Sequence, residues 1–345
     1  MSAPEAPARA AAPPSDSIAA ERADILSVRG LRKEFVSRRG SARVRAVDGI
    51  SFDLRRGEIL GLVGESGCGK TTTGKLVMRL IEPSSGSIVV DGLDTAGMGR
   101  EEDFAYRRRV QMIFQDPYAS MNPHFKVRDV LEEPLLIHGI GRSKAERMEI
   151  VERALEMVKM TPVSEFIDRH PHMLSGGQRQ RVATARTLIL SPRIIVADEP
   201  VSMIDLSTRA EILRLMKAIQ SDLGLSFIYI THDISTARYF ADRIAVMYLG
   251  RIVEIGTQDE VIDRPIHPYT RALIEAVCEP EPGRVDTLRD LKIKGEVPEA
   301  ADIPSGCRFR TRCLFATEEC ARLSEPELED AGGGHYHACR RWKEI

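Results

Sequence analysis

The chain has 345 residues, 43% of them hydrophobic and 29% charged, which is an ordinary globular composition with enough apolar material for a large buried core. Its length suits one large domain with an appendage, or two domains. A net charge of −2 gives no overall attraction to nucleic acid, and no apolar run approaches the length of a membrane-spanning helix, so any membrane role is expected to be peripheral.

Residues 1–24 are rich in Ala and Pro and have no apolar segment, which predicts a disordered tail rather than a secretory signal. Short apolar runs bounded by turn residues then predict strands. These runs are Ile25–Val28, Val44–Val47, Ile50–Leu54 and Glu58–Val63. The polar insert Ser37–Arg43 is expected to be a hairpin loop.

Residues 64–71 read GESGCGKT, a phosphate-binding loop of the form Gly-x-x-x-x-Gly-Lys-Thr. An apolar run precedes it and residues 71–82, with helical spacing, follow it, which is the strand–loop–helix context that the motif requires. Glycines let the backbone turn its N–H groups toward phosphate oxygens, and the helix N-terminus adds partial positive charge. The alternative is an ordinary glycine-rich turn.

This loop predicts a site for a nucleotide triphosphate. Lys70 is expected to reach the β- and γ-phosphates, and the Thr71 hydroxyl is expected to ligate Mg²⁺. The residues predicted to contact the nucleotide here are Gly64, Glu65, Ser66, Gly67, Cys68, Gly69, Lys70, Thr71 and Thr72.

The remaining pattern alternates strands and helices, which predicts a mostly parallel sheet flanked by helices. It is interrupted between residues 116 and 174 by a Glu-, Arg- and Met-rich insert, expected to be mostly helical and clearest at Lys144–Met160. The predicted strands after the phosphate loop are Ser87–Val90, Val110–Phe114, Arg193–Asp198, Leu225–Thr231, Asp242–Met247 and Arg251–Ile255, with helices at residues 212–223 and Ile234–Phe240.

An apolar strand, IIVAD, delivers two acids at its C-terminal end. Asp198 is expected to hold Mg²⁺, and Glu199 to polarise the water that attacks the γ-phosphate. Alone, the pattern also fits a strand followed by an acidic turn.

Residues 174–178 read LSGGQ at the start of a predicted helix. Ser175, Gly176, Gly177 and Gln178 therefore form a second candidate anion pocket. Because one triphosphate does not need two such pockets, this one is expected to close over a nucleotide held by another subunit. An N-cap by Ser175 is the alternative, and physical reasoning alone leaves the two interpretations close.

Together, GESGCGKT, LSGGQ, IIVADEP, Gln115 and His232 resemble the ATP-binding cassette (ABC) ATPases over about residues 25–260. The resemblance implies a P-loop NTPase (RecA-like) α/β core with a helical subdomain and an N-terminal antiparallel β subdomain, spanning residues 25–264. It also implies that two cassettes enclose two ATP molecules head to tail, with Lys70 and Thr71 of one facing Ser175–Gln178 of the other.

The same resemblance assigns further roles. It implies that Gln115 senses Mg²⁺ and the attacking water, that His232 contacts the γ-phosphate opposite Glu199, and that Phe35 stacks on adenine. Taken singly, His232 also fits a strand-end histidine, Gln115 a turn residue and Phe35 a core residue.

The loop after Glu199 departs from the family pattern. The family commonly has a Ser-Ala-Leu-Asp run, whereas this chain has Ser202-Met203-Ile204-Asp205. Asp205, which the family uses to communicate across the dimer, is present. The bulkier Met203 adds volume at the expected interface, which leaves room for a different cassette as the partner in place of strict self-pairing.

Four of the six cysteines lie near the C-terminus, with the spacing Cys307-x5-Cys313-x6-Cys320-x18-Cys339. In a cytosolic protein such clustering favours a metal or a cluster over disulfides. The spacing lacks the tight knuckles typical of zinc and so favours a [4Fe–4S] cluster. Unligated core cysteines are the alternative, and His335 and His337 are candidate ligands that are more simply explained as solvent-facing.

Residues 265–345 form a predicted irregular extension, which resembles the C-terminal extension of oligopeptide and dipeptide ABC importers through HPYT and PSGCRFRTRC. This resemblance implies a [4Fe–4S] cluster on the four cysteines. It also implies an ATPase at the cytoplasmic face of the inner membrane, with a second ATPase subunit as heterodimer partner, two permeases, an extracytoplasmic solute-binding protein and no nucleic acid.

The cargo is open, because nothing in an ATPase chain touches it. Some members of this branch carry oligosaccharides instead of peptides. A soluble cassette protein acting on DNA or ribosomes is a further alternative, but such proteins tend to have two cassettes or a long coiled-coil insert. A nucleotide sensor without hydrolysis is disfavoured by Glu199 and His232.

Overall fold

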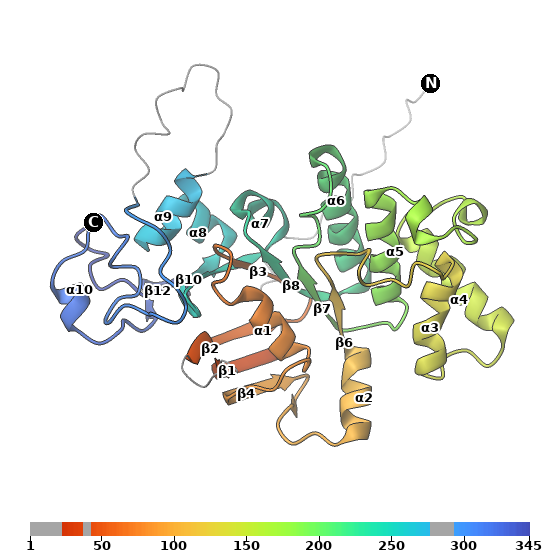
Figure 1. Cartoon of the computed structure of the whole chain (residues 1–345), viewed down its shortest axis with the longest axis horizontal. Coiled ribbons are helices and arrows are strands. Elements are labelled where there is room, and N and C mark those ends of the chain that lie inside the picture. Colours follow the sequence, from red (N-terminus) through yellow and green to blue (C-terminus); the bar gives the residue numbers. More distant parts are fainter. Residues whose placement is uncertain (1–22, 37–42, 277–292) are drawn as a thin grey trace, which may run out of the picture.

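The computed structural model describes residues 23–36, 43–276 and 293–345. Nearly all of the predicted disordered tail, most of the predicted hairpin loop and Cys278 lie outside these residues. Within the described part, two sheets form the centre of the molecule, a helical region lies at one end and the C-terminal extension at the other (Figure 1).

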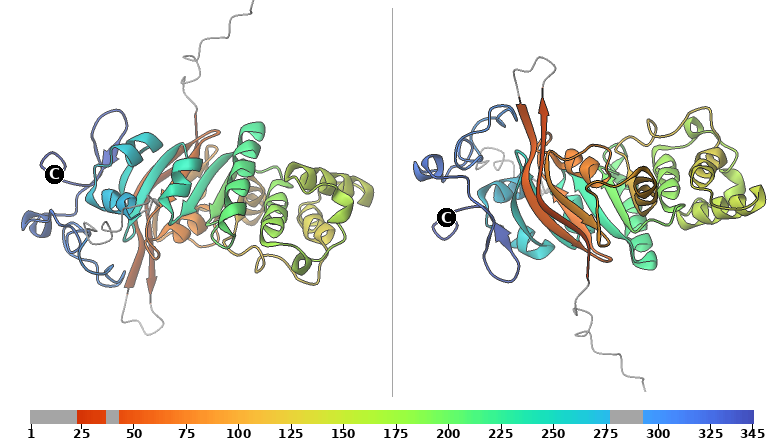
Figure 2. Two further views of the ribbon diagram at one scale, coloured as in Figure 1. Left: turned by 90° about the horizontal axis from the view of Figure 1, so that it is seen from above. Right: turned by 90° about the horizontal axis from the view of Figure 1, so that it is seen from below.

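The first sheet is antiparallel, with the order β2-β1-β4-β5. Its bounds are β1 Asp24–Val36, β2 Arg43–Arg55, β4 Ser85–Val90 and β5 Leu93–Asp94. The predicted runs Val44–Val47 and Ile50–Leu54 form a single strand, because the polar residues between them keep pairing with β1 through Asp48 and Arg32. The right view of Figure 2 shows the two long strands side by side.

The second sheet has the order β11-β12-β10-β9-β3-β8-β7-β6. Strands β9, β3, β8, β7 and β6 pair in parallel, as predicted, while β10 pairs antiparallel with β9. The bounds are β3 Ile59–Val63, β6 Val110–Ile113, β7 Ile194–Asp198, β8 Ser226–Thr231, β9 Arg243–Tyr248, β10 Arg251–Thr257, β11 Glu329–Asp330 and β12 Tyr336–His337.

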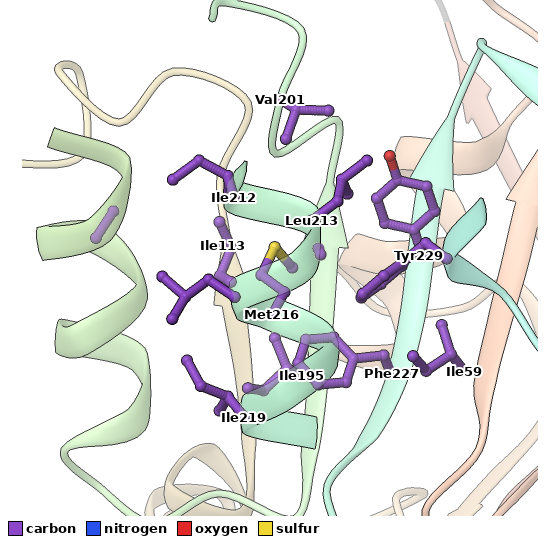
Figure 3. Close-up of a cluster of buried hydrophobic side chains, with 14 of the residues drawn as sticks. Ile59, Ile113, Ile195, Val201, Ile212, Leu213, Met216, Ile219, Phe227 and Tyr229 are labelled. Carbon is purple, nitrogen blue, oxygen red and sulfur yellow. The ribbon is translucent and has the colours of Figure 1, made fainter. Parts of the chain in front are cut away.

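Alternate residues of the central strands enter two separate hydrophobic cores, one on each face of this sheet. In β8, Phe227 and Tyr229 belong to the core beneath α6 (Leu206–Leu223), whereas Ile228 and Ile230 belong to the core shared with the antiparallel sheet. Figure 3 shows Met216 of α6 among the side chains of the first core.

The helix after the phosphate loop, α1 (Lys70–Val77), covers the second face and is shorter than the predicted 71–82. A Cβ on Gly74 would lie 2.9 Å from Ile230 Cδ1, so this helix approaches the sheet as closely as glycine allows. The helix α2 (Arg100–Arg109) was not predicted, because its only buried residue is Tyr106 and it therefore lacks a strong apolar stripe.

The predicted insert is mostly helical. It holds α3 (Val127–Ile137), α4 (Lys144–Met157) and two short 3₁₀ turns at Val163–Glu165 and Pro171–Met173, and it packs against α5 (Gly176–Leu188). Figure 2 shows this region projecting from the end of the molecule opposite the C-terminus.

The C-terminal extension joins the main sheet through β12, where His337 pairs with Glu254 of β10. The expectation that His335 and His337 face solvent is wrong, since they are only 5% and 1% exposed. His335 Nε2 lies 2.8 Å from Glu254 Oε1, which places it in a buried polar contact. Two further helices, α7 (Ile234–Phe240) and α8 (Gln258–Asp263), precede the extension. The extension itself contains α9 (Pro268–Glu275) and α10 (Glu319–Arg322).

Candidate nucleotide-binding and catalytic site

The phosphate loop connects β3 to α1, and its backbone requires glycine at two positions. Gly69, at the N-cap of α1, has a left-handed backbone, and a Cβ there would lie 2.2 Å from the Ala46 carbonyl oxygen. A Cβ on Gly64 would lie 2.2 Å from the Met247 carbonyl oxygen. The loop therefore packs directly against the backbone at Ala46 and Met247, and a side chain at Gly64 or Gly69 would displace it.

Lys70 points back into this loop. Its ammonium group donates hydrogen bonds to the carbonyl oxygens of Gly64, at 2.6 Å, and Glu65, at 2.9 Å. The residue is only 5% exposed. A positive charge thus lies within the loop at the place where the sequence predicts phosphate oxygens.

Thr71 and Asp198, both predicted magnesium ligands, meet at the end of β7. The Thr71 hydroxyl donates to Asp198 Oδ1 over 3.0 Å. Burial raises the pKa of Asp198, and the neighbouring Glu199 charge acts in the same direction, while the Thr71 bond opposes them. A hydroxyl beside a carboxylate is the hard oxygen donor pair that Mg²⁺ prefers, so these residues fit the ion.

The three predicted catalytic residues converge on one another. Gln115 Nε2 donates to Glu199 Oε2 over 2.9 Å, and His232 Nδ1 lies 3.0 Å from Glu199 Oε1. They follow β6, β7 and β8 respectively, and the carboxyl ends of parallel strands meet at one edge of a sheet. The backbone of Glu199 has a φ of +46°, an uncommon conformation for a residue with a side chain that here aims the carboxylate between its two partners.

The structure does not bring Ser175–Gln178 to the phosphate loop of the same chain, and α5 and α1 lie apart in Figures 1 and 2. Ser175 forms the predicted N-cap instead: its hydroxyl accepts from the Gln178 N–H, at 3.2 Å, and Gln178 Oε1 accepts from the Ser175 N–H, at 3.0 Å. This capping box is compatible with an anion pocket, because the remaining N–H groups of the first turn lack helical partners.

Two further predicted site residues, Asp205 and Phe35, lie on other elements than the predicted catalytic residues. Asp205 caps α6, where hydrogen bonds from the Ser207 hydroxyl and the Thr208 N–H lower its pKa to about 2. Met203 beside it is 64% exposed. Phe35 lies near the end of β1 and is 42% exposed, which leaves its ring available for stacking.

The four C-terminal cysteines line one pocket of the extension. Burial raises the pKa of Cys307 and of Cys339 to about 11, and the charges of the other cysteines act in the same direction, so the thiols are close neighbours. Across residues 23–36, 43–276 and 293–345, however, no three His, Cys, Asp or Glu side chains are arranged to hold a metal ion.

Sequence reasoning missed the contacts that the extension makes with the phosphate loop. Arg312, Arg308 and Tyr269 all approach this loop or its immediate supports. The run CRFRTRC shows an unusual density of arginine, but nothing in it identifies a partner more than two hundred residues away. Only the folded chain brings these groups together.

Two family profiles match the sequence. The ABC transporter profile matches residues 47–202, and the profile of the oligopeptide/dipeptide transporter C-terminal region matches residues 253–320. A protein of Brucella ovis, named for peptide import and ATP binding, is 48% identical over 317 residues, which is 92% of this chain and 98% of its own. The chain belongs to the ATP-binding proteins of the oligopeptide and dipeptide ABC importers.

Other relatives of this ABC ATPase include the dipeptide transport ATP-binding protein DppF of Haemophilus influenzae, 43% identical over 92% of this chain and 97% of its own. The oligopeptide transport ATP-binding protein AppF of Bacillus subtilis is 42% identical over 93% of this chain and 98% of its own.

Solved structures match the cassette part of the ATPase. The dimeric ATP-binding cassette MJ0796 bound to ADP and Pi has a TM-score of 0.61 and 28% identity, covering 68% of this chain and 98% of that one. The CbiO1 cassette of Clostridium perfringens has a TM-score of 0.62 and 28% identity, covering 70% and 91%. These matches confirm the predicted P-loop fold. In the described part of the chain, every helix is too short or too polar to cross a bilayer.

Proposed function

We propose that this ATPase binds MgATP in the loop of residues 64–72, hydrolyses it with Glu199 as the general base, and thereby drives peptide import through partner permeases. The observation that carries the proposal is the meeting of Gln115, Glu199 and His232 at the edge of the sheet next to the phosphate loop. A carboxylate placed between an amide and an imidazole can orient a water and take its proton.

The chemistry follows from these positions. Lys70 exchanges its carbonyl partners for β- and γ-phosphate oxygens, and Thr71 and Asp198 supply the oxygen atoms that hold magnesium. Magnesium, when bound, neutralises charge on the β- and γ-phosphates. Glu199 accepts a proton from the attacking water. The oxygen of that water bonds to the γ-phosphorus, and the bond between the γ-phosphorus and the β–γ bridging oxygen breaks. Gln115 holds the water and His232 donates to the γ-phosphate.

A second subunit completes the site in this proposal. Ser175–Gln178 would cover the γ-phosphate of a nucleotide held by the partner, in keeping with the first-turn N–H groups of α5. The exposed Met203 and Leu206, at 64% and 79%, place unpartnered apolar groups next to Asp205. The similar cassette MJ0796 is dimeric with ADP and Pi. The bulk of Met203 favours a related but different ATPase as the partner.

Exposed apolar residues beside Gln115 in the chain and in the helical insert support docking to membrane permeases. Phe114 and Tyr118 are 41% and 46% exposed, and Leu136 and Ile137 at the end of α3 are 57% and 60% exposed. Exposed apolar groups of this kind indicate a protein partner. With the names of the relatives, they favour a peripheral ATPase at the cytoplasmic face, below two permeases fed by an external binding protein.

Isolation from native membranes tests this assignment. The chain is expected to sediment with membranes when its permeases are present and to stay in the supernatant when they are deleted. Permeases and a peptide-binding receptor should co-purify with it. A receptor that binds oligosaccharides instead would reassign the cargo but keep the importer, whereas recovery with DNA or ribosomes and no permease would contradict the importer itself.

We further propose that Cys307, Cys313, Cys320 and Cys339 hold a [4Fe–4S] cluster. The supporting observation is that all four line one pocket. In such a cluster each thiolate binds a different iron, so the four sulfur atoms need not converge on one point as they would around zinc. The raised pKa values of the Cys307 and Cys339 thiols mean that bound metal is needed to hold these two as thiolates at neutral pH.

Anaerobic purification is expected to give brown protein with about four irons per chain. Cys320→Ser should lower the iron content and bleach the colour, whereas the control Cys278→Ser should change neither. Measurement combines metal analysis with visible absorption. Zinc without iron, or no metal at all in the anaerobic preparation, would contradict the cluster.

A further inference from the structure

The C-terminal extension makes hydrogen bonds to Glu65 of the phosphate loop. Arg312, from the extension, donates from Nη1 to Glu65 Oε2 at 2.7 Å and from Nη2 to Glu65 Oε1 at 3.1 Å. The Arg312 residue is only 6% exposed. Two parallel bonds between a guanidinium and a carboxylate fix direction as well as distance, which a lysine could not do.

The backbone of the same loop residue is held as well. The Glu65 N–H donates to the Tyr269 hydroxyl over 3.0 Å. Tyr269 begins the extension on α9, is fully buried, and packs against Tyr248 and Phe309 with ring centroids 4.7 and 5.4 Å apart. Both the main chain and the side chain of Glu65 therefore face the extension, and its carbonyl oxygen accepts from Lys70.

A second arginine supports the other side of the loop. Arg308 donates to the Leu249 carbonyl and to Asp48, and its side chain is almost fully buried. The next residue after Leu249, Gly250, donates its N–H to the Cys68 carbonyl over 2.9 Å. The turn held by Arg308 thus touches the phosphate loop three residues beyond Glu65.

We propose that Arg312 and Tyr269 are positioning residues of the ATP site. They fix the backbone of the phosphate loop at Glu65 and so determine nucleotide affinity. The loop binds phosphate through backbone N–H groups whose directions must be fixed before the nucleotide arrives, because ordering them on binding would cost affinity. The Glu65 N–H is turned to Tyr269, and the pair with Arg312 keeps that turn in place. The inference rests on the proposed binding of ATP in this loop.

Three variants change these contacts by small steps. Arg312→Ala removes the cation, Glu65→Gln keeps the side-chain shape but removes its charge, and Tyr269→Phe deletes one hydroxyl. The matched control is Arg322→Ala, which breaks an exposed ion pair with Glu318 elsewhere in the extension. Measurements are calorimetric affinity for MgADP and MgATP on the full chain, and KM and kcat for ATP in the assembled transporter.

We expect Arg312→Ala and Glu65→Gln each to weaken nucleotide binding about 10-fold and to raise KM similarly, with kcat at saturating ATP changed less than about 3-fold. The double variant of Arg312→Ala and Glu65→Gln should bind nucleotide as tightly as Arg312→Ala alone, because the two residues act as one pair. Arg312→Lys should lie between wild type and Arg312→Ala, and the Arg322→Ala control should bind as wild type.

Wild-type affinity in both Arg312→Ala and Glu65→Gln, with unchanged KM, would overturn the proposal, as would fully additive losses in the double variant. A melting temperature close to that of wild type for Glu65→Gln separates lost positioning from lost folding. Should Lys70→Ala also bind nucleotide normally, the proposed ATP site itself fails. Should Lys70→Ala lose binding while the pair variants keep it, only the positioning role fails.

Discussion

Glu199→Gln is expected to lower the ATP turnover of the assembled transporter by at least about 100-fold while leaving MgATP affinity within about 3-fold of wild type. The amide has almost the shape of the carboxylate, so it can keep its contacts with Gln115 and His232, which lie 2.9 and 3.0 Å away. It cannot accept the proton of the attacking water. Turnover and nucleotide affinity measured on the same preparation check this expectation.

The matched control is Glu211→Gln on α6. The Glu211 carboxylate pairs with Arg181 at 3.4 Å and takes no part in the contacts between Gln115, Glu199 and His232. It should keep wild-type turnover. Retained hydrolysis in Glu199→Gln would remove this residue from its role. Equal losses of affinity and turnover would instead indicate that the loop carrying it, with its φ of +46°, had collapsed.

Lys70→Ala is expected to weaken MgATP binding at least about 30-fold, because it removes a buried charge-assisted donor to the phosphates. The ammonium lies within the loop, 2.6 Å from the Gly64 carbonyl oxygen. Calorimetry with MgADP and MgATP measures the loss. Lys144→Ala, which removes an exposed lysine at the start of α4, is the control and should bind as wild type.

Because Lys70 also bonds two loop carbonyls, its loss could unsettle the loop itself. Lys70→Arg tests this point, since it keeps a cation there with a different reach and geometry. Partial binding by Lys70→Arg, with none by Lys70→Ala, would confirm that charge carries the interaction. Unchanged ATP affinity in Lys70→Ala would contradict the assignment of residues 64–72 as the nucleotide site.

The central strands and most flanking helices could be predicted from sequence because their signals are local. Apolar runs of six or seven residues predicted β3, β7 and β8 to within one residue, and the Ile234–Phe240 helix agrees at both ends. The helix α2 was missed because its surface is charged nearly all round, which leaves no periodic apolar stripe.

The polar residues of the extension were harder to place. His335 and His337 look solvent-facing in a stretch rich in glycine and charge, yet β12 carries them onto the edge of the main sheet. The buried carboxylate of Glu254, which accepts from His335 and from the Ile266 and His267 N–H groups, makes the burial of His335 possible. Nothing in the sequence near residue 335 shows that partner.

The sequence by itself determined the chemistry: a glycine loop with a lysine, two acids after a strand and a helix-capping serine are motifs whose function depends on neighbours a few residues away. Only the tertiary structure decided which separate motifs meet. Gln115, Glu199 and His232 converge because parallel strands end at one edge, and Arg312 reaches Glu65 because β12 and α9 fold the extension back onto the sheet. Contacts across such separations depend on how the whole chain packs, which no local pattern records.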